Sequence, residues 1–93
     1  MRTVRLNSRE KNVLRCLDEV TGSTGAELEE LCHIDKNDLL NILQGLLNTG
    51  LLEAYLPGRD VAVLDEITFE ELETARFEVN PGFAQELKQS MRR

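Results

Sequence analysis

The fold is decided by residues 24–52, which read TGAELEELCHIDKNDLLNILQGLLNTGLL. Thr24 and Glu27 have the spacing of a capping box, which predicts that a helix starts here. A short turn follows, and Asp35 caps a second helix. Gly50 is expected to end that helix in the left-handed conformation that glycine adopts readily. The apolar residues after it predict a strand, so the stretch predicts two helices and a tight turn leading into a β hairpin.

The second of these helices has two distinct faces. One face is apolar, with residues at helical spacing that we expect to turn inward: Leu39, Ile42, Leu43, Leu46 and Leu47. The opposite face carries amides around Gly45, with one cation nearby: Lys36, Asn37, Asn41, Gln44 and Asn48. We therefore predict a neutral exposed surface on this helix.

Local signals also predict the elements around this unit. Before it, residues 3–6 alternate as in a short strand, and Asn7 with Glu10 caps a first helix. Two apolar stripes are expected to be buried, on the first and second helices respectively: Val13, Leu14, Leu17 and Val20, and Leu28, Leu31 and Cys32.

The part of the chain after Gly50 predicts a wing and a last helix. The expected segments are a strand over 51–56, a turn over 57–60, a short returning strand over 61–64, an acidic insert over 65–73, a last strand over 75–79 and a helix over 80–92. Within the insert, Thr68 and Glu71 have the spacing that caps a single helical turn. The sequence leaves open whether this insert is ordered.

Length and charge set the protein class. The 93 residues predict a single domain over 1–93, and an apolar content of 41% favours a globular chain over a disordered one. The net charge of −6 is uneven, because basic ends flank an acidic middle. No apolar run approaches the roughly 20 residues that span a bilayer. Residues 1–6 lack the apolar core of a signal peptide, so we expect a cytoplasmic protein without membrane contact.

Cysteine and histidine usage argues against a metal site. Cys16 and Cys32 lie on apolar helix faces, where a free thiol behaves as a small hydrophobic group. A disulfide between them would require closely crossing helices and is disfavoured in a reducing compartment. The chain has one histidine and no Cys-x-x-Cys pair, so zinc ligands at the usual spacing are missing. We expect neither a metal nor a cofactor.

Three segments resemble a known superfamily: residues 24–28, residues 43–52 and residues 77–82. They are similar to the second helix, the exit of the recognition helix and the strand-to-helix step of the winged helix-turn-helix proteins. The closest resemblance is to small prokaryotic transcription regulators of the multiple-antibiotic-resistance type. The resemblance implies an α+β fold with a three-helix core, a helix-turn-helix over 24–50, an antiparallel wing over 51–79 and a C-terminal helix over 80–92. It also implies DNA binding and a homodimer through the C-terminal helix. The apolar residues of that helix, Phe83, Leu87 and Met91, would equally serve to cover the domain's own core.

Two functions remain open after this comparison. Amide side chains can read adenine edges, so the amide face suits DNA readout. Phosphate contacts would then come from arginines and lysines outside this face: Arg2, Arg5, Arg9, Lys11, Arg15, Arg59, Arg92 and Arg93. Lys36 is the only cation near the face itself. The acidic helix-turn-helix would instead repel a phosphate backbone, and a neutral helix face suits a protein interface. The alternative is therefore an acidic winged-helix module that binds a protein and not DNA.

Catalysis is not expected. The chain has a single histidine, and no serine or cysteine has an evident base partner. The paired acids Glu29-Glu30 and Glu70-Glu71 are neighbours in sequence, so on a helix they point apart. We therefore expect a protein that acts by binding.

Overall fold

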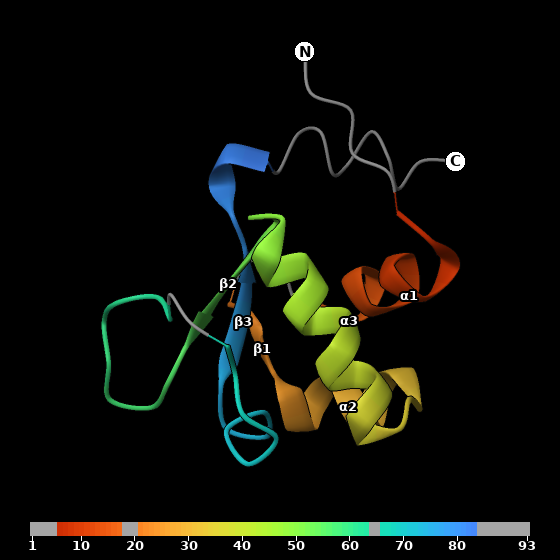
Figure 1. Ribbon diagram of the computed structural model, residues 1–93, viewed down its shortest axis with the longest axis horizontal. Helices are drawn as coiled ribbons and strands as arrows, with labels where there is room; N and C mark the ends of the chain where they lie inside the picture. Colours follow the sequence, from red (N-terminus) through yellow and green to blue (C-terminus); the bar gives the residue numbers. More distant parts are fainter. Residues whose placement is uncertain (1–5, 18–20, 64–65, 84–93) are drawn as a thin grey trace.

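The structure is a computed structural model, and it describes residues 6–17, 21–63 and 66–83 (Figure 1). Its elements in chain order are α1 (Ser8–Cys16), β1 (Ser23–Thr24), α2 (Gly25–Cys32), α3 (Lys36–Asn48), β2 (Leu52–Tyr55), β3 (Arg76–Val79) and the 3-10 helix η1 (Pro81–Phe83). Of the predicted strand over 3–6, only residue 6 is described. Val20 of the first apolar stripe lies outside the described residues.

The three helices pack beside a small antiparallel sheet, which confirms the α+β class (Figure 1). The strand order is β1-β3-β2. In the register, Ser23 pairs with Phe77, and Ala54 pairs with Phe77 from the other side. The arrangement is compatible with a winged-helix-like fold.

The predicted helix starts are confirmed. Asn7 and Glu10 exchange hydrogen bonds of 2.8 and 2.9 Å between side chain and backbone, and Thr24 and Glu27 exchange bonds of 3.2 and 3.0 Å. The Asp35 carboxylate accepts from the Asn37 N–H at 3.1 Å and caps α3. These bonds satisfy N–H groups that have no partner within the helix.

The predicted end of α3 is also confirmed. Thr49 closes the helix, and Gly50 follows with a φ of 84°, in the left-handed region. The Leu51 N–H then donates to the Leu46 carbonyl at 3.2 Å, which directs the chain into β2. A glycine at this point therefore sets the angle between α3 and the sheet.

The core lies between the helices and one face of the sheet. The largest fully buried side chains come from all three helices, β3 and the insert: Val13, Leu28, Leu39, Leu43, Leu46, Leu72 and Phe77. Ile42 and Leu47 are partly buried and pack against this cluster. The predicted inward face of α3 is thus confirmed, and the core joins the helices to the sheet.

The acidic insert is an integral part of the domain over its described residues. Ile67 and Leu72 are buried in the core. Thr68 and Glu71 exchange hydrogen bonds of 3.0 and 3.1 Å between side chain and backbone, as their spacing predicts. The segment forms turns and no regular helix. The insert therefore adds apolar anchors to the core despite its acidic composition.

Two predictions about individual segments are wrong. Leu31 is 57% exposed, because the buried stripe of α2 is narrow and consists of Gly25, Leu28 and Cys32. Residues 61–63 form no strand. Only a bond of 2.7 Å from the Val63 N–H to the Ala54 carbonyl joins this segment to β2. The strand β3 pairs with β2 along its length because that register buries Phe77.

The sheet also contains a strand that the sequence pattern did not predict. β1 has two residues, and the second of them, Thr24, is also the N-cap of α2. A two-residue strand has no alternation to detect, so only its pairing with β3 defines it.

The predicted C-terminal helix over 80–92 is described only at its start. Residues 81–83 form η1, where the Asn80 side chain accepts from the Gly82 N–H at 3.0 Å and donates to the Gly50 carbonyl at 2.9 Å. Residues 84–93 lie outside the described part of the chain. The observed segment is thus a 3-10 turn attached to the end of α3.

Gly25 is the glycine whose substitution we expect to be most damaging. A Cβ atom there would overlap the Leu72 backbone carbonyl, and backbone cannot move aside as a flexible side chain can. We expect Gly25→Ala to lower the free energy of unfolding by about 3 kcal/mol or more. Chemical denaturation followed by circular dichroism measures this change.

Gly45→Ala is the matched control. A Cβ atom at Gly45 meets nothing within 4 Å, and alanine favours the helix by about 1 kcal/mol. We therefore expect this variant to be more stable than the wild type. Equal stability of Gly25→Ala and the wild type would show that α2 and the insert do not approach each other as described.

Candidate interaction surface

The exposed face of α3 is the first candidate site. Asn37, Asn41 and Asn48 are exposed, while the leucines on the other side of the helix are buried. Gly45 lies among these amides, and the space around its Cα is open. We call Asn37, Asn41, Gly45 and Asn48 the open amide face.

Lys36 is not available to this face, because the insert holds its side chain. Its Nζ lies 2.9 Å from a carboxylate oxygen of Glu73 and 4.2 Å from the centre of the Phe69 ring. The Lys36 side chain is only 21% exposed. An ammonium placed between a carboxylate and an aromatic ring is already neutralised and partly desolvated. The one cation of α3 therefore serves to attach the insert.

Gln44, further along α3, also attaches the insert to this helix. Its Oε1 accepts from the Ile67 N–H at 2.9 Å, and its Nε2 donates to the Asn48 side chain at 3.1 Å. The bond to Ile67 satisfies a backbone donor beside a buried residue. Gln44 thus belongs to the attachment of the insert and not to the open amide face on which the sequence predicted it.

The predicted arginines lie at three separate places. Arg9 on α1 reaches Asp38 on α3 at 3.9 Å, with side chains 71% and 51% exposed. Arg15 is exposed near the end of α1. Arg59 is exposed in the loop after β2. The structure therefore brings Arg9 to the start of α3 and leaves Arg15 and Arg59 without a described contact to the open amide face.

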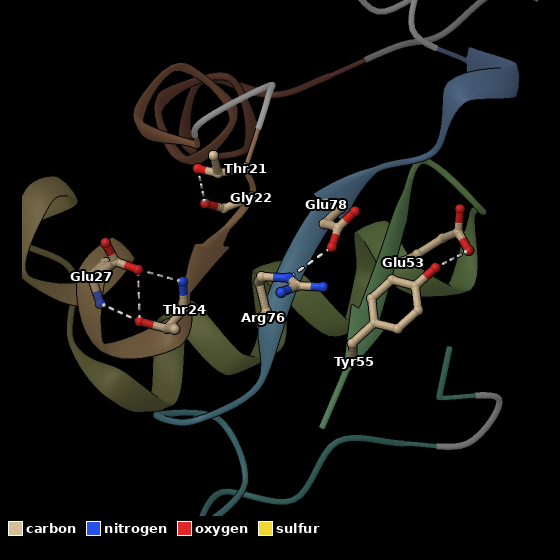
Figure 2. A network of polar contacts seen from close by, with 8 residues as sticks. All are labelled: Thr21, Gly22, Thr24, Glu27, Glu53, Tyr55, Arg76 and Glu78. Carbon is tan, nitrogen blue, oxygen red and sulfur yellow. Dashed lines mark hydrogen bonds and ion pairs between the residues drawn. The ribbon is translucent and has the colours of Figure 1, made fainter. Parts of the chain in front are cut away.

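A second polar cluster covers the open face of the sheet (Figure 2). Glu53 on β2 and Glu78 on β3 are register partners, so two like charges stand opposite each other. The Tyr55 hydroxyl donates to Glu53 at 3.2 Å, and Arg76 Nε donates to Glu78 at 2.7 Å. The Arg76 guanidinium lies 5.7 Å from the Tyr55 ring centre. Each acid thus has its own donor, which offsets their repulsion.

Sequence reasoning did not single out this cluster as a site. The signal was present, because the alternation predicted for residues 51–56 and 75–79 places Glu53, Tyr55, Arg76 and Glu78 away from the core. The pairing of the two strands was needed to bring them together.

Two side chains, one in this cluster and one in the insert, have shifted pKa values. The Tyr55 pKa is raised above 10.0, first by burial and then by the negative charge of Glu53. The Glu71 pKa is lowered, first by the backbone N–H of Thr68 and then by its hydroxyl. Neither group combines with a nucleophile or a second titrating group in a way that suggests catalysis.

Two hollows adjoin the segment after β2. One hollow of about 420 Å³ is lined by Thr24, Tyr55, Leu56, Pro57, Gly58, Arg59, Asp60, Thr74 and Arg76. The other, of about 410 Å³, is lined by Leu56, Arg59, Val61, Ala62, Val63, Glu66 and Glu71. Arg59 is shared by both and makes no ion pair with another described residue. Both hollows are open to solvent, and their walls mix the two charge signs.

Within residues 6–17, 21–63 and 66–83, no three side chains of histidine, cysteine, aspartate or glutamate come together as metal ligands. In the same part of the chain, no helix is both long and apolar enough to cross a membrane. No protein-family model, no curated protein and no solved structure matches this chain.

The contact that holds Lys36 can be measured by a double-mutant cycle. We expect Lys36→Gln and Glu73→Gln to show a coupling free energy of about 1 kcal/mol in chemical denaturation, because the pair is short and partly buried. The exposed Arg9–Asp38 pair is the control. Arg9→Gln and Asp38→Asn should couple by less than about 0.3 kcal/mol. Equal coupling in both cycles would contradict the special position of Lys36.

Tyr55 offers a spectroscopic test, because it is the only tyrosine in the chain. We expect tyrosinate absorbance to appear at a higher pH in the folded protein than in the unfolded chain. Glu53→Gln should shift this titration back toward pH 10, and Glu78→Gln should shift it less, because Glu53 contributes more to the raised pKa.

The same shift predicts how stability depends on pH. Because the folded pKa lies above the unfolded value, the neutral Tyr55 phenol stabilises the fold fully below pH 10, and this contribution is lost as pH rises through the folded pKa. A Tyr55 titration at or below that of the unfolded chain would contradict the contact with Glu53.

Proposed function

We propose that this chain is a non-enzymatic winged-helix module that binds a protein partner through the open amide face of α3. The observation that supports the proposal is the state of Lys36. Its charge is already paired with Glu73 and stacked on Phe69. The exposed surface of α3 therefore offers amides and Asp38 but no unpaired cation from the helix itself.

Such a surface has the chemistry of an interface centre. Charged side chains are depleted there because their desolvation is costly, whereas amides can exchange hydrogen bonds with a partner's backbone. The open space over Gly45 allows a partner chain to approach α3 closely. The acids around the amide face, with a net chain charge of −6, would steer a basic partner toward it.

DNA binding is the second candidate, and one observation favours it. The side chains of Asn37 and Asn41 are exposed one helical turn apart near the start of α3, with Arg9 next to them through Asp38. Amides at this spacing suit adenine edges in a major groove, and Arg9 would contact phosphate. This candidate agrees with the resemblance to transcription regulators of the multiple-antibiotic-resistance type. It then implies a cytoplasmic regulator that dimerises through residues 80–92.

A gel-shift assay and an affinity capture separate the two candidates. We expect no shift of random duplexes at micromolar protein in roughly 50 mM salt, because an acidic surface with a paired lysine does not displace enough counterions. We expect capture of a partner from cell extract by the immobilised chain. Asn41→Arg should abolish capture, and Asn12→Arg, the same change at an exposed position of α1, should not.

DNA binding would be recognised by two further measurements. If duplexes shift, Asn41→Ala should relax the sequence preference, and Arg9→Gln or Arg15→Gln should reduce the salt dependence of binding. Capture that survives Asn41→Arg, or a salt-dependent shift, would overturn the protein-binding proposal.

A further inference from the structure

The two cysteines of the chain lie at the ends of two helices that pack against each other, α1 and α2. The Cys32 Sγ donates to the Asn12 carbonyl of α1 at 4.0 Å. That carbonyl lies one helical turn before Cys16, so the Cys32 sulfur contacts the turn of α1 that carries Cys16. Both are free cysteines.

The two thiols differ in access. Cys32 is 8% exposed and belongs to the hydrophobic core. Cys16 is half-buried and packs against the edge of that core. A small oxidant in solvent therefore reaches Cys16 first.

Their chemistry differs as well. Burial raises the pKa of the Cys32 thiol to about 12, and the neighbouring Cys16 thiol adds to this effect. A thiol that stays protonated is a poor nucleophile, so Cys32 reacts with an oxidant in solution more slowly than an ordinary thiol does. Its attack on an oxidised Cys16 also requires the thiolate, but the packing of the two helices assists that step by holding Cys32 against the turn that carries Cys16. The asymmetry suits an outer thiol that is oxidised and an inner thiol that captures the product.

We propose that Cys16 and Cys32 form an intramolecular disulfide when the protein meets a hydroperoxide, and that this bond joins α1 to α2. Cys16 attacks the peroxide and becomes a sulfenic acid, while the peroxide O–O bond breaks and releases water or an alcohol. The Cys32 sulfur then attacks the Cys16 sulfur, the S–O bond breaks, and water leaves. In sum, two thiols lose two hydrogens and two electrons, and one peroxide is reduced.

The position of the bond gives it a structural effect. It would connect the last residue of α1 to the last residue of α2. Without it, the two helices are joined by the segment that contains β1 and are held together by side-chain packing. A disulfide that closes such a loop restricts the unfolded chain and raises stability. The orientation of α2, and through the turn after Cys32 that of α3, would then be set covalently. The inference does not depend on which partner α3 binds.

The test uses the full chain treated with hydrogen peroxide and then with dithiothreitol. We expect the intact mass to fall by two hydrogen atoms and non-reducing peptide mapping to join the peptides of Cys16 and Cys32. We also expect Tm to rise by on the order of 10 °C. Dithiothreitol should reverse all three changes.

Two variants test the order of the steps. In Cys32→Ala, peroxide should leave a sulfenic acid on Cys16 that a dimedone-type reagent traps, with no rise in Tm. In Cys16→Ser, Cys32 should resist oxidation at the same peroxide dose. The wild-type mass, map and Tm decide the proposal even if Cys32→Ala fails to fold.

Three results would overturn the proposal. They are a covalent dimer in place of the intramolecular bond, a mass that only gains oxygen on both cysteines, or an oxidised monomer that is less stable than the reduced one.

Discussion

The close approach of α2 to the insert is the constraint on which the rest of the fold depends. Gly25 lies directly against the backbone of Leu72. Two N–H groups in the first turn of α2, those of Gly25 and Ala26, donate to the carbonyls of Ala75 and Glu73 at 3.2 Å each. The insert and the residues that lead from it into β3 thus satisfy helix donors that would otherwise lack partners, and they can do so only because no side chain separates the two backbones.

This contact has consequences on both sides. Toward the sheet, it places Thr24 beside Arg76, so that β1 joins the edge of β3. Toward the helices, it places Glu73 next to Lys36. The pairing of β1 and the neutralisation of α3 are therefore linked to the same backbone contact. The functional surface and the fold cannot be separated in this small domain.

Much of the fold follows from local sequence signals. The capping pairs Asn7–Glu10, Thr24–Glu27 and Thr68–Glu71 involve residues three apart, so their spacing alone predicts them. The periodicity of α3 likewise predicts which leucines face the core. The failures involve partners distant in sequence. The exposure of Leu31 and the failure of residues 61–63 to form a strand depend on how elements pack, which no local pattern records.

The candidate site divides in the same way. The exposure of Asn37 and Asn41 follows from helical periodicity. Periodicity does not predict that Lys36 and Gln44 are absent from the open amide face. Their partners Glu73 and Ile67 lie in the insert, far along the chain. Composition alone counted Lys36 as an available cation, and only the tertiary contacts assign its charge to a structural role.

An amide face does not by itself select a partner. Asparagine side chains donate and accept equally well toward base edges and toward peptide groups. Selection must come from the charges around them, because these act at distances of about 8 Å at physiological salt, before contact is made. Around the start of α3 the nearest groups are Asp35 and Asp38, with Arg9 close to Asp38 and Lys36 already paired. A polyanion approaching this surface meets repulsion first, whereas a basic protein meets attraction and then a neutral contact area. The charges around the amide face therefore support the proposal of a protein partner over that of DNA.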